Sequence, residues 1–269
     1  MSVFRTSNPL LTANAFGGSD DGRYGNFAVR EARPGTMTLQ GAVNATAILL
    51  GLTVAAGILS WVYLQKLPAL MFPAFIGGSI LALVLTLVAS FKPKLSPYLG
   101  PVIAVAEGLF AGAASIFWTR YAAGSESEIV GSLGTGLVLQ AALLTVGVAG
   151  GLLLAYKTRL IRATENFKLG IMAATTGLCF FSLIAFALSM FGIRIPYIWD
   201  NGPIGLIFSG AIVVLAALNL VLDFDFIEKG AERGLPKHME WFAGIGLLVT
   251  LVWLYVSLLR LLAQLQRRD

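Results

Sequence analysis

The chain alternates between long hydrophobic runs and short polar segments. Seven runs stand out, at positions of about 43–64, 68–91, 97–119, 131–156, 166–192, 203–224 and 239–264. A helix needs about 20 apolar residues to cross the hydrocarbon of a bilayer. Continuous runs of this length favour helices over the shorter alternating strands of a membrane barrel. The pattern therefore predicts an all-α polytopic membrane protein, with a bundle of seven transmembrane helices at 41–269.

Composition agrees with this prediction. Of the 269 residues, 57% are hydrophobic and 12% are charged, whereas soluble domains carry about 25% charged residues. Residues 1–40 differ from the rest, since they are polar and include the turn-rich stretches GGSDDG and ARPGT. We expect them to form a partly disordered N-terminal tail.

The basic residues predict the orientation of the bundle. Thirteen of the 19 Lys and Arg residues lie in the N-terminal tail and in the loops that would share its side of the membrane. Five lie on the other side, and Arg260 falls within the last run. Loops rich in Lys and Arg stay in the cytoplasm. The N-terminus is therefore predicted to be cytoplasmic.

Two glycine clusters predict close contacts between helices. The third run contains GLFAG (108–112), and the fourth contains GVAGG (147–151). Small residues at such spacings let helix backbones approach each other. We expect both clusters to lie at helix–helix interfaces.

Ionisable residues inside a membrane are expensive and usually face the bundle interior. Glu107 lies in the middle of the third run, and Arg260 lies near the outer end of the seventh. We expect them to form an intramembrane ion pair, although Arg260 could instead extend its side chain towards the outer interface.

The end of the sixth run carries two carboxylates. Asp223 and Asn219 are four residues apart, so they share a helix face, and we expect both to point inward. Asp225 lies roughly 200° around the helix from Asp223, so it is expected at the cytoplasmic surface. An alternative leaves Asp223 in the hydrated interface as well. Glu240, at the start of the seventh run, is the nearest other acid.

Nothing in the chain predicts an enzyme or a bound cofactor. The phosphate-binding pattern GxxxxGK[ST] is absent, and His238 is the single histidine, too few for a histidine-based zinc site. No metal site is predicted beyond calcium at Asp223 and Asp225, whose hard oxygens suit that ion.

Several stretches together resemble the Bax inhibitor-1/YccA family of transmembrane proteins, in its larger bacterial branch. The stretches, in chain order, are SNPLL, NAF, TMTLQGAVNATAILL, AEGLFAGAAS, RATENFKLGI, LDFDFIEKG and EWFAGIGLLVTLVWLYVSLLRLL. Together, in this order, the stretches extend over nearly the whole chain from about residue 7. The resemblance implies a bundle with a central last helix and a calcium leak that responds to pH.

The resemblance also assigns residues. In the bacterial type, one carboxyl in the sixth span and one in the seventh share a proton and hold a cytoplasmic gate. Asp223 matches the first, but Thr250 stands where the second is expected. The gate would then pair Asp223 with Asp225 or with Glu240. Arg260 matches the family's arginine, while its acidic partner is missing from the second run, and Glu107 is the candidate replacement.

The predicted function is a pH-sensitive calcium leak channel in a bacterial inner or plasma membrane, with the bilayer, calcium and protons as its partners. Two alternatives remain open. One is a regulator that transports nothing and binds a membrane protease or secretion component through its tail. The other is a proton-coupled secondary transporter, which an inverted repeat would favour, and none is visible. No nucleic acid partner is expected.

Overall fold

The computed structural model describes residues 35–124, 130–192 and 202–267, and these residues contain seven long helices. They are α1 (Leu39–Lys66), α2 (Met71–Phe91), α3 (Ser96–Ala123), α4 (Val130–Lys157), α5 (Glu165–Met190), α6 (Pro203–Glu232) and α7 (Met239–Gln266). Each is long and apolar enough to cross a membrane. The predicted all-α membrane fold is thus confirmed.

The helices begin and end where local chemistry favours it. Thr38 caps α1 by accepting a hydrogen bond from the Gly41 amide at 2.9 Å, and Thr164 caps α5 in the same way. Pro203 is the first residue of α6, where the missing amide hydrogen is no loss. The α6 helix continues to Glu232, two turns beyond the predicted end of the sixth run. Its charged last turns therefore project from the apolar part of the helix.

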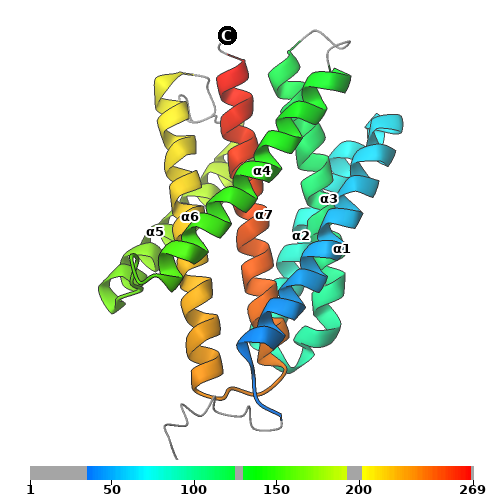
Figure 1. Cartoon of the computed structure of the whole chain (residues 1–269). Helices are drawn as coiled ribbons and strands as arrows, with labels where there is room; N and C mark the ends of the chain where they lie inside the picture. Colours follow the sequence, from blue (N-terminus) through cyan, green and yellow to red (C-terminus); the bar gives the residue numbers. More distant parts are fainter. Residues whose placement is uncertain (1–34, 125–129, 193–201, 268–269) are drawn as a thin grey trace, which may run out of the picture. The chain divides into compact units, whose positions relative to one another are not determined.

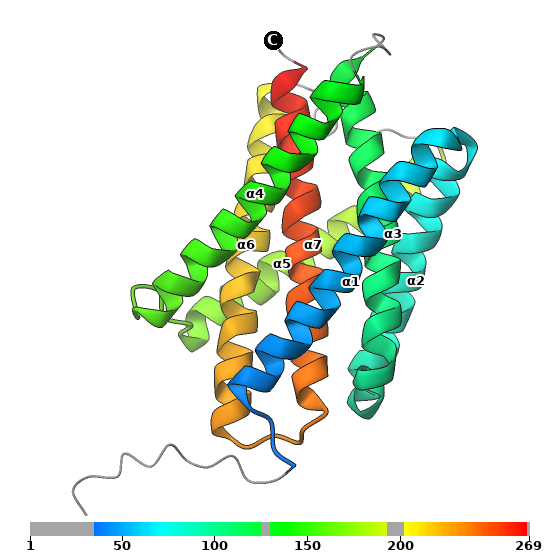
Figure 2. The same cartoon turned by 45° about the vertical axis from the view of Figure 1, so that its right-hand side comes forward.

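The last helix lies in the middle of the bundle (Figures 1 and 2). α7 packs against α1, α3, α4 and α6, while α2 packs mainly on α3 and α5 mainly on α6. Burial follows this arrangement, since half of the most apolar window of α7 is buried but only 11% of that of α5. The central position implied by the family resemblance is present.

The glycine clusters behave differently from one another. A Cβ built at Gly108 would lie 2.5 Å from the Thr53 carbonyl oxygen, and one at Gly112 would lie 2.6 Å from the Gly57 carbonyl oxygen. The GLFAG cluster therefore packs backbone to backbone against α1, as predicted. Around Gly147 and its two neighbouring glycines nothing lies within 4 Å of a built Cβ. The prediction for GVAGG was wrong, because that face of α4 is turned away from the other helices.

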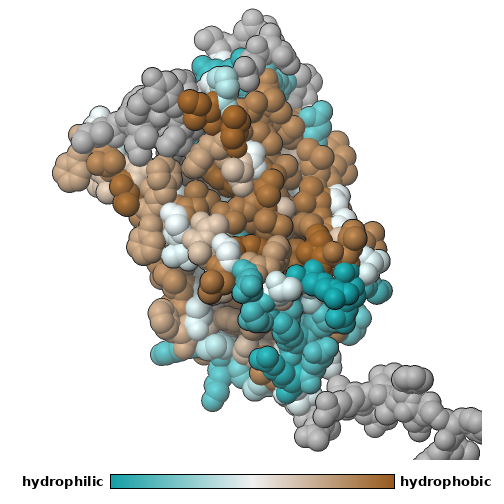
Figure 3. All heavy atoms as spheres, turned by 90° about the vertical axis from the view of Figure 1, so that its left-hand side faces the viewer, coloured by the Kyte–Doolittle hydropathy of each residue, from teal (hydrophilic) through white to brown (hydrophobic). Residues whose placement is uncertain are grey.

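The outward faces of the bundle are apolar. Large exposed hydrophobic side chains occur along the outer helices, including Leu83 of α2, Leu143 of α4 and Phe186 of α5. Figure 3 shows a largely hydrophobic surface with hydrophilic residues gathered below it. Apolar faces of this kind fit contact with lipid rather than with water.

Residues 1–34 of the predicted tail lie outside the described residues. The segment just before α1 is ordered. The Met37 amide donates to the Leu235 carbonyl at 2.6 Å, and the Lys237 amide donates to the Gly35 carbonyl at 2.9 Å. Residues 35–38 therefore pair with the loop between α6 and α7, and the predicted tail is ordered at its end.

Candidate functional site

Asp223 lies on the face of α6 that packs against the central helix. Its Oδ1 is 3.7 Å from a Cβ built at Gly246, and the Thr250 side chain is a polar neighbour of its carboxyl on α7. Its Oδ2 is enclosed and has no hydrogen-bond partner. A glycine at 246 leaves the room that the carboxyl occupies. Asp223, Gly246 and Thr250 therefore form the candidate site, which we call the Asp223 site.

The Thr250 hydroxyl determines what this site can do. Its Oγ1 donates to the Gly246 carbonyl at 3.1 Å. A hydroxyl has one proton to donate and two lone pairs to offer. While that proton is on the Gly246 carbonyl, only a protonated Asp223 can complete a hydrogen bond to Thr250. An ionised Asp223 would need the hydroxyl to turn away from Gly246. A hydrogen bond between Asp223 and Thr250 would therefore depend on the proton of the Asp223 carboxyl.

Asp225 faces away from the Asp223 site. Its Oδ2 pairs with Lys168 Nζ of α5 at 2.7 Å and with Lys229 Nζ at 3.0 Å. The residue is only 8% exposed, so it is a buried member of an ion-pair network rather than a solvated surface acid. The predicted pairing of Asp223 with Asp225 is not present, because the regular helix puts the two on different sides.

The same network joins α4 to α6. Tyr156, near the end of α4, donates to Glu228 and lies 3.5 Å from Asp225 Oδ1. Arg159 pairs with Glu228 at 3.7 Å. We call the end of the bundle that holds these groups the charged end. Its ion pairs and hydrogen bonds connect the end of α4 and the start of α5 to α6.

Glu240 also has partners other than Asp223. Its Oε1 accepts hydrogen bonds from the Thr38 amide and the Thr38 hydroxyl, both at 2.8 Å, and from Lys237 Nζ at 2.9 Å. Its carboxylate also fills the space where Gly41 would carry a side chain. A negative charge at a helix N-terminus is favourable. Glu240 therefore fastens the start of α1 to the start of α7.

Asn219 points to a different neighbour from the one expected. Its Nδ2 donates to Thr175 Oγ1 of α5 and to the Leu215 carbonyl, both at 2.8 Å. Asn219 thus joins α6 to α5, whereas Asp223 faces α7. The other polar contacts between α5 and α6 include the ion pairs Lys168–Asp225 and Glu165–Lys229.

The predicted ion pair between Glu107 and Arg260 is not present. The structure describes both residues, and no ion pair connects them. α3 and α7 begin at the same end of the bundle (Figure 1). Glu107 is eleven residues into α3 and Arg260 is 21 residues into α7, a difference in depth of about 15 Å. Glu107 is buried, and the Arg260 guanidinium lies 5.8 Å from the centre of the Trp118 ring.

No calcium site is assembled from the described acids. Among the residues that the structure describes, no three His, Cys, Asp or Glu side chains are grouped so that they could hold a metal ion. Calcium at Asp223 and Asp225 does not fit either, because two lysines already neutralise Asp225.

A family model described as Bax inhibitor 1 like matches residues 8–267. The chain belongs to the Bax inhibitor-1 family. Comparisons with curated proteins and with solved structures gave no match. The protein is therefore a multi-pass membrane protein of the Bax inhibitor-1 family.

In this Bax inhibitor-1 protein, the resemblance put Thr250 at the position of the family's second carboxyl, and in the structure Thr250 is a neighbour of Asp223. Sequence reasoning missed the partners of Asp225, which are Lys168, Lys229 and Tyr156. A signal for Lys168 was available. It begins the fifth run while Asp225 ends the sixth, so the two lie at one depth on consecutive antiparallel helices.

Proposed function

We propose that the protein is a pH-sensitive calcium leak pathway, with the Asp223 carboxyl as the group that senses protons. The observation that carries the proposal is the Asp223 carboxyl of α6, whose Oδ2 is enclosed without a hydrogen-bond partner among the described residues and which has Thr250 as a polar neighbour on α7. Membership of the Bax inhibitor-1 family supports it.

Protonation would act by a change in hydrogen bonding. With a proton, Asp223 donates to Thr250, while Thr250 donates to the Gly246 carbonyl. This chain of hydrogen bonds joins α6 to the central helix. Without the proton, a carboxylate lies at a packed helix interface, which costs free energy unless water or a cation reaches it. Raising the pH would therefore favour a looser interface that admits a cation.

The acids at the charged end and at the start of α7 would keep their charges and partners during this change. Asp225 and Glu240 are each neutralised by lysine, so neither competes for the proton that Asp223 holds. A carboxyl that no lysine neutralises suits passage, because conduction requires an ion to bind weakly enough to leave.

The test is calcium entry into proteoliposomes that hold the purified protein, measured with an enclosed indicator at pH values from about 5 to about 8, where carboxyls in unusual environments titrate. The wild-type flux should rise with pH. Asp223→Asn keeps the size but cannot ionise, so its flux should stay at the low-pH level throughout.

Glu232→Gln is the matched control, because it removes a carboxylate from an exposed position at the end of the same helix. It should keep the wild-type pH profile. A wild-type profile in Asp223→Asn would refute the role of Asp223. No flux above empty liposomes at any pH would refute the leak and favour a regulator that binds a membrane partner.

A further inference from the structure

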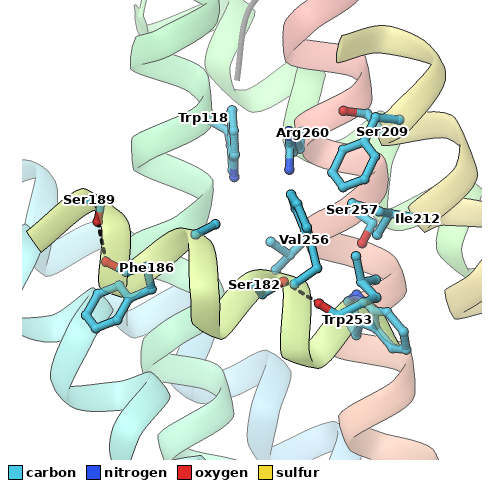
Figure 4. Close-up of a pocket in the computed structure, with 14 residues that line it drawn as sticks. Trp118, Ser182, Phe186, Ser189, Ser209, Ile212, Trp253, Val256, Ser257 and Arg260 are labelled. Carbon is cyan, nitrogen blue, oxygen red and sulfur yellow. Dashed lines mark hydrogen bonds between the residues drawn. The ribbon is translucent and has the colours of Figure 1, made fainter. Parts of the chain in front are cut away.

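A cavity lies in the half of the bundle remote from the charged end. It has a volume of about 570 Å³ and is lined by residues of α3, α5, α6 and α7 (Figure 4). Ligand sites commonly measure about 300–1,000 Å³. α5 packs mainly against α6, and the cavity lies between α5, α6 and α7. The Asp223 site is not part of it.

The walls of the cavity are mainly apolar, with its charged residue at one end. Phe181, Ile212 and Trp253 are among its apolar lining residues, and Arg260, Ser209 and Ser257 are among its polar ones. Ser182 and Ser189 also line the cavity, but their hydroxyls donate to carbonyls of their own helix. Figure 4 shows Arg260 and Ser209 at the upper end and Trp253 at the lower end. A cavity with a cation at one end and mainly apolar walls elsewhere matches an amphiphile.

The Ser209 hydroxyl is a second, independent observation that points to a ligand. The residue is 1% exposed, and its Oγ has no hydrogen-bond partner within the described part of the chain. A buried hydroxyl without a partner costs free energy. In Figure 4 this oxygen is directed to the side on which Arg260 lies. A ligand oxygen between the two side chains would satisfy the hydroxyl.

The depth of these groups matches a lipid in the surrounding bilayer. Arg260 is six residues before the end of α7, and Ser209 is six residues after the start of α6. Both are thus about 9 Å from their helix ends, close to the interfacial region of a bilayer. The apolar walls continue from there towards the membrane centre, as an acyl chain does.

We propose that the cavity binds an anionic phospholipid, with its phosphate at Arg260 and Ser209 and one acyl chain along the apolar wall. Donor chemistry favours this occupant, because an arginine and a buried serine hydroxyl in the cavity lining offer the N–H and O–H groups that phosphate oxygens accept. Arginine is well suited to phosphate oxygens. The site is separate from the proposed leak and does not depend on it.

The experiment is native mass spectrometry of the purified protein, which counts bound lipid with phosphatidylglycerol or with zwitterionic phosphatidylcholine of the same acyl chains. Wild type should retain phosphatidylglycerol preferentially. Arg260→Gln should lower that preference about tenfold, the effect of about 1.4 kcal/mol expected for one charge-assisted hydrogen bond. Arg267→Gln is the matched control, since Arg267 stacks on Tyr121 outside the cavity, and it should keep the wild-type preference.

A second pair of variants tests the acyl-chain part. Ala185 lines the cavity, whereas Leu183 on the same helix is exposed and does not. Ala185→Trp should fill the space and reduce lipid retention, while Leu183→Trp should leave it unchanged. Circular dichroism confirms that each variant remains helical.

Three results would overturn the proposal. In the first, the two arginine variants lose equal preference, so the effect is general charge. In the second, Ala185→Trp binds lipid as wild type does, so the chain lies elsewhere. In the third, inorganic phosphate alone displaces the lipid, so the site recognises a free anion.

Discussion

Replacing Gly108 by alanine should destabilise the protein by separating α1 from α3. The new Cβ would lie 2.5 Å from the Thr53 carbonyl oxygen and 2.6 Å from the Ala56 Cβ. Ordinary contacts between such atoms are about 3.5–4.0 Å, so one helix must move by about 1 Å. Overpacking of this kind costs about 1–3 kcal/mol.

Two further effects enter the estimate. The movement strains the hydrogen bond from Thr53 Oγ1 to the Ala104 carbonyl, now 2.9 Å, which contributes about 1 kcal/mol. Alanine is the better helix former by about 1 kcal/mol, which offsets that loss. The net expectation is a free energy of unfolding lowered by about 2 kcal/mol. Unfolding by sodium dodecyl sulfate in mixed micelles, followed by circular dichroism, measures it.

The control is Gly147→Ala, where nothing lies within 4 Å of the new Cβ. It should raise the free energy of unfolding by up to about 1 kcal/mol, because only helix propensity changes. Equal shifts for Gly108→Ala and Gly147→Ala would refute the reasoning, since helix propensity would then account for both.

Two more predictions concern the buried acids. Thr250→Asp should move the rise of calcium flux to higher pH, because two facing carboxyls share a proton, whereas Thr250→Asn adds no charge and should not show that shift in the proteoliposome assay. Glu240→Gln should lower the free energy of unfolding by about 1–3 kcal/mol through weakened charge-assisted hydrogen bonds. Lys237→Met should lower it by less than about 1 kcal/mol, because the Lys237 side chain is 60% exposed. Unfolding in mixed micelles compares the two, and a larger loss in Lys237→Met would contradict the role given to Glu240.

Helical periodicity explains why sequence reasoning separated Asp223 from Asp225 but missed their neighbours. Residues two positions apart lie on different sides of a helix. In the structure Asp223 lies against α7, and Asp225 pairs with Lys168 of α5. The spacing says nothing about which helix lies on each side. For the same reason Asn219 was assigned to the Asp223 face, although it bonds to Thr175.

The sequence by itself determined the helices and their approximate limits. Hydrocarbon leaves a backbone few ways to satisfy its polar groups, so long apolar runs must become helices wherever the chain packs. The resemblance to a family also came from the sequence, because it depends on motifs in a fixed order. The same order showed that Thr250 stands where the family's second carboxyl is expected.

Only the tertiary structure decided which buried polar groups meet. Glu240 binds Thr38 across 202 positions of the chain, and Glu107 and Arg260 lie too far apart in depth to pair. The glycines of GLFAG pack against α1, whereas a Cβ built at any glycine of GVAGG has no neighbour within 4 Å. These outcomes depend on the rotation and depth of each helix, which the packing of all the described helices sets together and which no single apolar run encodes.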